Sequence, residues 1–141
     1  MPRGGVKKKR AIRHVMLAPD DDAAIAFIGK VHGHGTQSDS VRFAMNQQRA
    51  RAVSGKHWAF EEALREQVLS MERTAGLDRH RKGLPKQASI LRKFGIWVDM
   101  QDEDAMAVIR DAYDLESKSA AVRFAVRCQA RFDRGGIGDE S

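Results

Sequence analysis

The tetrapeptide Val41-Arg42-Phe43-Ala44 occurs a second time as Val122-Arg123-Phe124-Ala125, 81 residues further along the chain. Extending this match without a gap pairs residues 21–48 with residues 102–129, and ten of the 28 pairs are identical. Self-similarity at one fixed offset indicates a repeated structural unit. We therefore predict two copies of a unit of about 40 residues, separated by a linker of similar length.

Each copy begins with an alternating pattern that is typical of a short strand. In the second copy the apolar residues Phe94, Ile96 and Val98 alternate with Gly95 and Trp97. A period of two gives a strand with one buried face. At the offset of 81, apolar residues at positions 15 and 17 hold the equivalent inward places of the first copy. Since Trp97 lies between two inward positions, we expect its indole to point outward unless the linker covers it.

Two helices are predicted to follow each strand. Acidic triplets favour the start of the first helix, where the macrodipole is positive. A Gly or Asp that can adopt the left-handed conformation then ends it, and hydroxyl side chains cap the second helix. These features are Asp20-Asp21-Asp22 and Asp102-Glu103-Asp104 at the first starts, Gly33 and Asp114 at the ends, and Thr36, Ser38, Ser117 and Ser119 at the second starts.

The order strand, helix, turn, helix resembles the ribbon-helix-helix family of DNA-binding proteins. The motif at the second helix is Thr36-Gln37-Ser38-Asp39-Ser40-Val41-Arg42-Phe43-Ala44 in one copy and Ser117-Lys118-Ser119-Ala120-Ala121-Val122-Arg123-Phe124-Ala125 in the other. Members of this family are usually homodimers whose two strands form an antiparallel ribbon in the major groove. Two copies in one chain therefore imply an intramolecular pseudodimer, similar to the tandem members of conjugative plasmids and of T-DNA transfer systems.

The resemblance implies a mainly α fold with a two-stranded antiparallel ribbon and an extra linker helix. The predicted layout is a flexible basic arm over residues 1–10, a first unit over 11–53, a linker helix and basic loop over 54–91, a second unit over 92–133 and a flexible tail over 134–141. An apolar stripe predicts the linker helix from about Lys56 to Thr74, with Glu61 and Arg65 as an exposed ion pair. We expect this helix to cover Phe43 or Phe124.

The charge of the chain favours a polyanionic partner. Lys and Arg number 25 against 19 Asp and Glu, a formal net charge of +6. Twelve of the basic residues lie in two acid-free segments, residues 1–13 and 79–93, each directly before a predicted strand. These segments are either solvated basic loops or arms that contact phosphates.

The resemblance also implies which side chains meet DNA. The outward strand positions would contact base edges, and we assign this role to His14, Met16, Lys93, Trp97 and Asp99. Helix starts and basic arms would hold phosphates, and we assign this role to Lys7, Lys8, Lys9, Arg10, Arg13, Thr36, Ser38, Arg92, Ser117, Lys118 and Ser119. Because the outward residues of the two copies differ, the two halves should prefer different bases. Arg42 and Arg123 are assigned either phosphate contacts or salt bridges.

Several other classes of function are not favoured by the residues. The single Cys128 has no recognisable base beside it, and the acidic triplets are explained by the helix dipole, so we expect no catalytic site. The His32-Gly33-His34 turn has no matching ligands at metal spacing, so we expect neither a metal nor a cofactor. No apolar run is long enough to cross a bilayer, and the expected location is the cytoplasm, without membrane contact.

We therefore expect a sequence-specific protein for double-stranded DNA, acting as an accessory factor in conjugative or T-DNA-type transfer. Other DNA-processing proteins of a relaxosome are expected partners, and the monomeric pseudodimer is expected to assemble further on DNA. A transcriptional repressor of the same fold is the alternative. A helical protein-interaction module with incidental charge is a third hypothesis.

Overall fold

The computed structural model describes residues 10–80 and 91–135, with the side chains of 72–80 outside the description. Along this part of the chain the order strand, helix, helix occurs twice, with one helix between the two sets. The elements are β2 (Ala11–Leu17), α1 (Pro19–His32), α2 (Gln37–Ser54), α3 (Glu61–His80), β3 (Arg92–Val98), α4 (Met100–Ala112) and α5 (Lys118–Asp133). The expected mainly helical fold with a two-stranded antiparallel sheet is confirmed over these residues.

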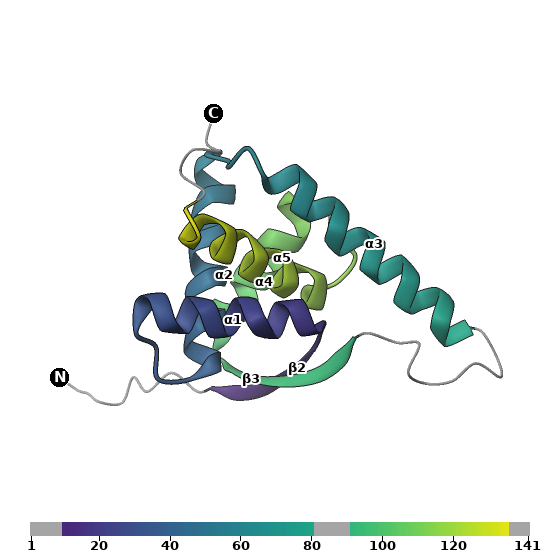
Figure 1. Ribbon diagram of the computed structural model, residues 1–141, viewed down its shortest axis with the longest axis horizontal. Helices are drawn as coiled ribbons and strands as arrows, with labels where there is room; N and C mark the ends of the chain where they lie inside the picture. The colour runs from purple at the N-terminus through teal and green to yellow at the C-terminus, as the bar shows by residue number, and fades with distance from the viewer. Residues whose placement is uncertain (1–9, 81–90, 136–141) are drawn as a thin grey trace.

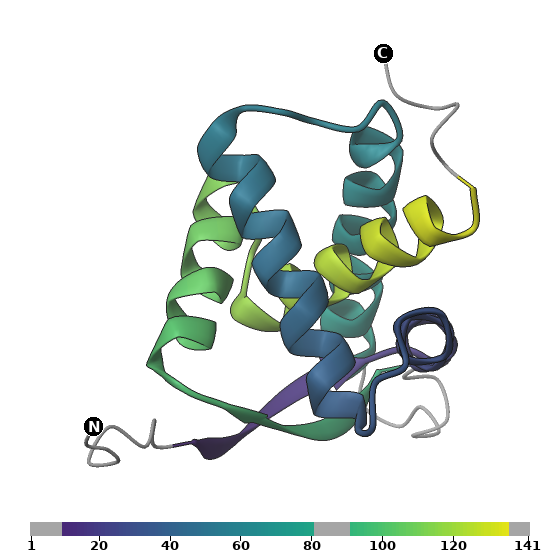
Figure 2. The same cartoon turned by 90° about the vertical axis from the view of Figure 1, so that its left-hand side faces the viewer.

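The two strands pair antiparallel over their whole length, from Ala11 opposite Val98 to Leu17 opposite Arg92. Both strands show the same alternation of burial, in which Val15, Leu17, Ile96 and Val98 face the helices. The helices lie on one side of this ribbon in both views (Figures 1 and 2). No described element covers the opposite side, so the ribbon has one face in the core and one face in solvent.

The predicted helix ends match the structure. Gly33 ends α1 with φ of 72°, and Asp114 follows α4 with φ of 53°, both in the left-handed region. The acidic residues do begin α1 and α4: the Asp21 carboxylate accepts from the backbone N–H of Ala18, and the Asp102 carboxylate accepts from that of Asp99. These bonds satisfy N–H groups at the helix starts.

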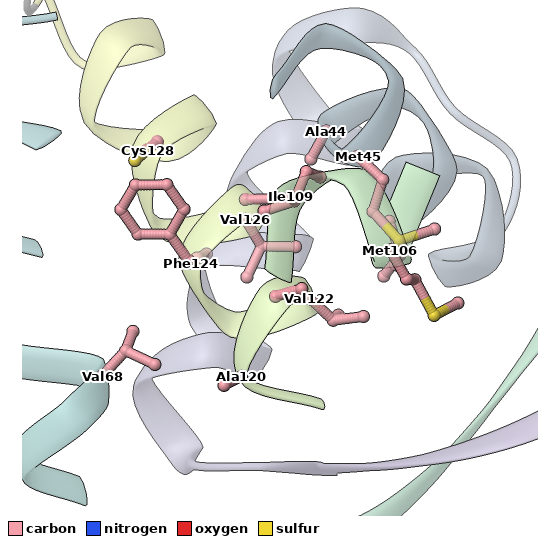
Figure 3. Close-up of a cluster of buried hydrophobic side chains, with 14 of the residues drawn as sticks. Ala44, Met45, Val68, Met106, Ile109, Ala120, Val122, Phe124, Val126 and Cys128 are labelled. Atoms are coloured by element: carbon pink, nitrogen blue, oxygen red, sulfur yellow. The ribbon is translucent and has the colours of Figure 1, made fainter. Parts of the chain in front are cut away.

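The core lies between the ribbon and the helices and uses equivalent residues of both sets. Met45 of α2, Ile109 of α4 and Val122 of α5 are fully buried and gather in one cluster (Figure 3). Close packing of this kind makes each set of helices depend on the other. Cys128 is also buried, and burial raises the pKa of its thiol, so it lacks the character of a nucleophile.

The linker helix exists, but its position and its polar face differ from the prediction. It begins at Glu61 rather than near Lys56. Trp58 and Phe60 precede it and stack on each other, with ring centroids 5.0 Å apart. Of the two phenylalanines, it is Phe124 that the helix approaches, because α3 packs against α5 and Val68 is fully buried there (Figure 3).

The predicted exposed pair of Glu61 and Arg65 is wrong. Glu61 is buried, and its carboxylate accepts from Gln48 Nε2 at 2.9 Å. Gln48 also donates to the Tyr113 hydroxyl at 2.8 Å, and His57 Nδ1 lies 2.9 Å from the other Glu61 oxygen. The cluster ties the linker to α2 and α4. An i,i+4 spacing indicates a shared helix face but not whether that face is covered.

We expect the protein to unfold as a monomer. Because the ribbon closes within one chain, the midpoint of urea unfolding should not change over a hundredfold range of protein concentration. Circular dichroism at each concentration measures this midpoint. A midpoint that rises with concentration would show that folding requires a second chain.

Candidate nucleic-acid interface

The solvent face of the ribbon consists of three cross-strand pairs. Their register is Ile12 opposite Trp97, His14 opposite Gly95 and Met16 opposite Lys93. All six residues are exposed, with Ile12 and Trp97 each 51% and Met16 37% accessible. Six large hydrophobic side chains are exposed among the described residues, and three of them lie on this face. Trp97 thus points outward as predicted, and no described part of the linker covers it.

The register is centred on the repeat. Adding 81 to the number of His14 gives Gly95, its equivalent in the second copy. Gly95 is also the residue that lies opposite His14 across the ribbon. The same addition converts Ile12 to Lys93 and Met16 to Trp97, so equivalent residues lie at opposite ends of the face. A Cβ atom on Gly95 would stand 3.2 Å from Ile12 Cγ2 and 3.6 Å from His14 Cδ2. Glycine therefore lets these two side chains lie close to the centre of the face.

Ser38 and Ser119 do not cap their helices, contrary to the simplest interpretation of the sequence. The caps are Thr36 and Ser117, whose side chains accept from the backbone N–H three residues later. The Ser38 hydroxyl accepts from the N–H of Trp97 at 3.0 Å, and the Ser119 hydroxyl accepts from the N–H of Met16 at 3.0 Å. Each serine therefore accepts a hydrogen bond from a backbone N–H at the outer edge of the strand that belongs to the other set.

The arginines one turn later complete this contact. Arg42 Nη1 donates to the carbonyl of Trp97 at 2.8 Å, and Arg123 Nη1 donates to the carbonyl of Met16. Arg123 is fully buried, which its position in the sequence does not indicate. We call these two pairs, Ser38 with Arg42 and Ser119 with Arg123, the serine–arginine clamps. Each clamp binds the N–H and the C=O of one strand residue.

One turn after each clamp arginine, a further side chain of α2 or α5 contacts the first helix of the other set. Asn46 donates to Asp102 at 3.3 Å, and the equivalent Arg127 donates to Asp21 at 2.6 Å. Burial raises the pKa of Asp21, and the adjacent Arg127 guanidinium acts in the opposite direction. The acidic residues thus join the two sets as well as beginning their helices.

The clamps place the starts of α2 and α5 at the two edges of the ribbon. The first backbone N–H groups of a helix have no intrahelical partner and carry partial positive charge. In α2 and α5, Thr36 and Ser117 occupy the third of these N–H groups, that of Asp39 and that of Ala120 respectively. Within the part of the chain that the structure describes, the N–H groups of the first two residues in each helix have no intrahelical partner. Backbone N–H groups in this position favour an anion.

The predicted phosphate-binding side chains are in different situations. Arg10 and Arg92 are exposed at the ribbon. Arg13 lies on the helix side of β2, 3.2 Å from the Glu103 carboxylate, and Lys118 lies 3.1 Å from the other oxygen of the same group. No pattern in the sequence indicates Glu103 as a partner for either residue. Lys7, Lys8 and Lys9 lie outside the described residues, as do the basic residues at 81, 82 and 86.

The prediction that Asp99 contacts bases is wrong. Asp99 is 9% exposed and caps α4, accepting from the N–H of Asp102 at 2.9 Å. The equivalent Ala18 is also buried. The strand alternation ends one residue earlier in each copy because the chain turns into a helix there. The outward face therefore stops at Met16 and Trp97.

The histidine turn is built from packing contacts. His32 and His34 lie against Phe43, with ring centroids at 4.4 and 5.2 Å. Within residues 10–80 and 91–135, no group of three or more His, Cys, Asp or Glu side chains is placed to hold a metal ion. None of the helices in this part of the chain is long and apolar enough to span a membrane.

Comparison of the chain with protein-family models, with curated proteins and with solved structures gives no match. Its function must therefore be inferred from its own residues and their geometry.

The serine–arginine clamps should contribute strongly to stability. Replacing Arg123 with Met keeps most of the volume but removes a charged donor from the Met16 carbonyl, and should lower the free energy of unfolding by about 2 kcal/mol. Ser119→Ala should lower it by about 1 kcal/mol. Urea unfolding measures both.

Arg110→Ala is the matched control for the arginine change. Among the described residues, the Arg110 guanidinium pairs only with its exposed neighbour Asp111, so its loss should change stability by less than about 0.5 kcal/mol. A loss in Arg123→Met no larger than in this control would contradict the clamp.

Proposed function

We propose that this protein binds double-stranded DNA in a sequence-specific manner, by inserting the β2–β3 ribbon into the major groove as an intramolecular ribbon-helix-helix pseudodimer. The observation that carries the proposal is an uncovered ribbon face with a helix N-terminus at each edge. A two-stranded ribbon fits the width of the major groove. In that position the starts of α2 and α5 would lie at the phosphates on either side.

The centred register supports the pseudodimer. In a twofold arrangement of two equal units, the residue on the axis must face its own equivalent, and His14 faces Gly95. The serine–arginine clamps exchange in the same way, because the Ser38 contact becomes the Ser119 contact when both partners are shifted by 81 residues. One chain would thus supply both halves of the DNA-binding unit.

The exposed side chains suit the surface of a groove. Trp97, Ile12 and Met16 offer apolar contact to base edges, and Lys93 offers a donor. Arg10 and Arg92 flank this face and would contact the backbone. A protein-interaction module would also expose apolar side chains, but the helix N-termini and the net charge of +6 favour a polyanion.

Within DNA binding, we propose a role as an accessory factor in DNA processing and transfer. Two unequal halves in one chain suit a site without twofold symmetry, such as an origin of transfer. This step rests on analogy with tandem members of the family. A transcriptional repressor is the alternative, and a footprint over a promoter would favour it.

Trp97 provides a direct test of the ribbon face. Trp97→Ala should weaken binding to a specific duplex by about 1–3 kcal/mol, because the indole is exposed on the face that enters the groove. Non-specific binding and the thermal midpoint should change little. Fluorescence anisotropy with specific and random duplexes measures the two affinities.

Val53→Ala is a suitable control for Trp97→Ala. Val53 is 72% exposed near the end of α2 that lies away from the ribbon. The variant should therefore bind both duplexes with the affinities of the unchanged protein. Equal losses on both duplexes in Trp97→Ala would remove this residue from base recognition.

The basic N-terminal segment should act through the phosphates. If roughly 6–10 phosphates are neutralised, log K should fall steeply with log salt, by about 0.9 per phosphate. Deleting residues 1–10 removes Arg3, Lys7, Lys8, Lys9 and Arg10, and should flatten this slope by several units while the preferred site stays the same. Binding isotherms between 50 and about 300 mM salt give the slope.

Lys56→Gln serves as the comparison for this deletion. Lys56 is exposed just beyond the far end of α2, so its removal should leave the slope almost unchanged. A deletion variant with the slope of the unchanged protein would exclude the arm from the interface.

A further inference from the structure

We infer, resting on the proposed function, that the DNA site has two chemically different halves: thymine methyl groups opposite Ile12 and Trp97, and a guanine opposite Lys93. The DNA bound by this chain would then have a direction, and the protein would bind it in one orientation.

The two copies differ most consistently on the solvent face of the ribbon. Across the offset of 81, the buried strand residues are conservative pairs, Val15 with Ile96 and Leu17 with Val98. The clamp residues Ser38 and Arg42 are identical to their equivalents. On the outer face no pair matches: Ile12 corresponds to Lys93, His14 to Gly95 and Met16 to Trp97. The scaffold is thus nearly symmetric, and the surface offered to the bases is not.

One end of the face is apolar. Ile12 and Trp97 are direct cross-strand neighbours, and each is half exposed. Neither side chain can accept a hydrogen bond, and only the indole N–H can donate one. The feature of the major groove that such a pair matches best is the C5-methyl group of thymine. Burying methyl groups there would remove this apolar surface from water.

The other end combines an apolar side chain with a positive charge. Met16 lies opposite Lys93, and Lys93 forms no ion pair with any described residue. Arg13 and Lys118, by contrast, share the Glu103 carboxylate. An exposed ammonium group on the solvent face of the ribbon matches the O6 and N7 acceptors of guanine. The centre between the two ends is filled from one strand, by His14 over Gly95.

The experiment begins with selection of bound sequences from a library of random duplexes by the full-length protein. We expect an enriched site without twofold symmetry, with thymines in one half and a guanine in the other. A palindromic site with equal halves would overturn this inference and leave the proposed function intact. No enrichment over random DNA would overturn the proposed function and the inference with it.

Base analogues that lack one functional group, placed in the selected duplex, then test each half of the site. Replacing thymine with deoxyuridine removes only the methyl group, and should weaken binding about fourfold for each methyl in contact. Replacing guanine with 7-deazaguanine removes one acceptor in the other half and should also weaken binding. Anisotropy titrations measure both effects.

Protein variants assign each effect to one end of the ribbon. In Trp97→Ala the deoxyuridine effect should shrink, because only Ile12 still contacts the methyl groups, and the 7-deazaguanine effect should be kept. In Lys93→Met the 7-deazaguanine effect should be lost and the deoxyuridine effect kept. Val53→Ala should keep both. If either base change has the same effect in all variants, the assignment of bases to the two ends is wrong.

A symmetrised face gives an independent test. The double variant Lys93→Ile with Trp97→Met repeats Ile and Met at both ends of the ribbon, while every clamp residue is retained. The changed side chains are exposed, so the thermal midpoint should stay close to that of the unchanged protein. Selection with this variant should yield a site closer to a palindrome, without the guanine. An unchanged directional site would show that the ribbon face does not set the direction.

Discussion

The structure depends on how the edges of a two-stranded ribbon are satisfied. Such a ribbon has an unpaired backbone edge on each side, and a buried N–H or C=O without a partner destabilises a fold. Here a serine and an arginine on one helix bind both polar groups of a single strand residue, at Trp97 and again at Met16. Because each clamp binds the strand of the other set, neither set alone can satisfy the polar groups at the outer edge of its own strand.

This arrangement separates the residues that stabilise the fold from those exposed on the outer face of the ribbon. The inward strand residues, the clamps and the Asp21 and Asp102 contacts stabilise the fold on the helix side of the ribbon. The outer face takes no part in the core, so its residues are free to differ between the copies at little cost in stability. This explains how a chain with a symmetric backbone register can offer Ile12 and Trp97 at one end and Met16 and Lys93 at the other.

The linker helix adds a contribution that a dimer of separate chains would lack. It packs on α5, and its first residue, Glu61, enters a buried cluster with Gln48 and Tyr113. Burial raises the pKa of Tyr113, and the Glu61 charge acts in the same direction. The phenol therefore remains a neutral partner of Gln48. This cluster fixes the start of α3 near α2 and α4, and that end of the helix lies away from the ribbon (Figure 1).

The sequence by itself determined the repeat, the order of the elements, the outward position of Trp97 and the helix ends at Gly33 and Asp114, because periodicity and local backbone preferences act over a few residues. Only the tertiary structure decided the long-range partners. From the sequence, Ser38 is expected to be a cap and Arg123 to contact a phosphate or form a salt bridge. Asp99 is expected to be an outward strand residue, and Glu61 half of a surface pair. Each is buried or bonded to a group more than ten residues away, or lies where a strand turns into a helix, and no local pattern records such a partner or turn.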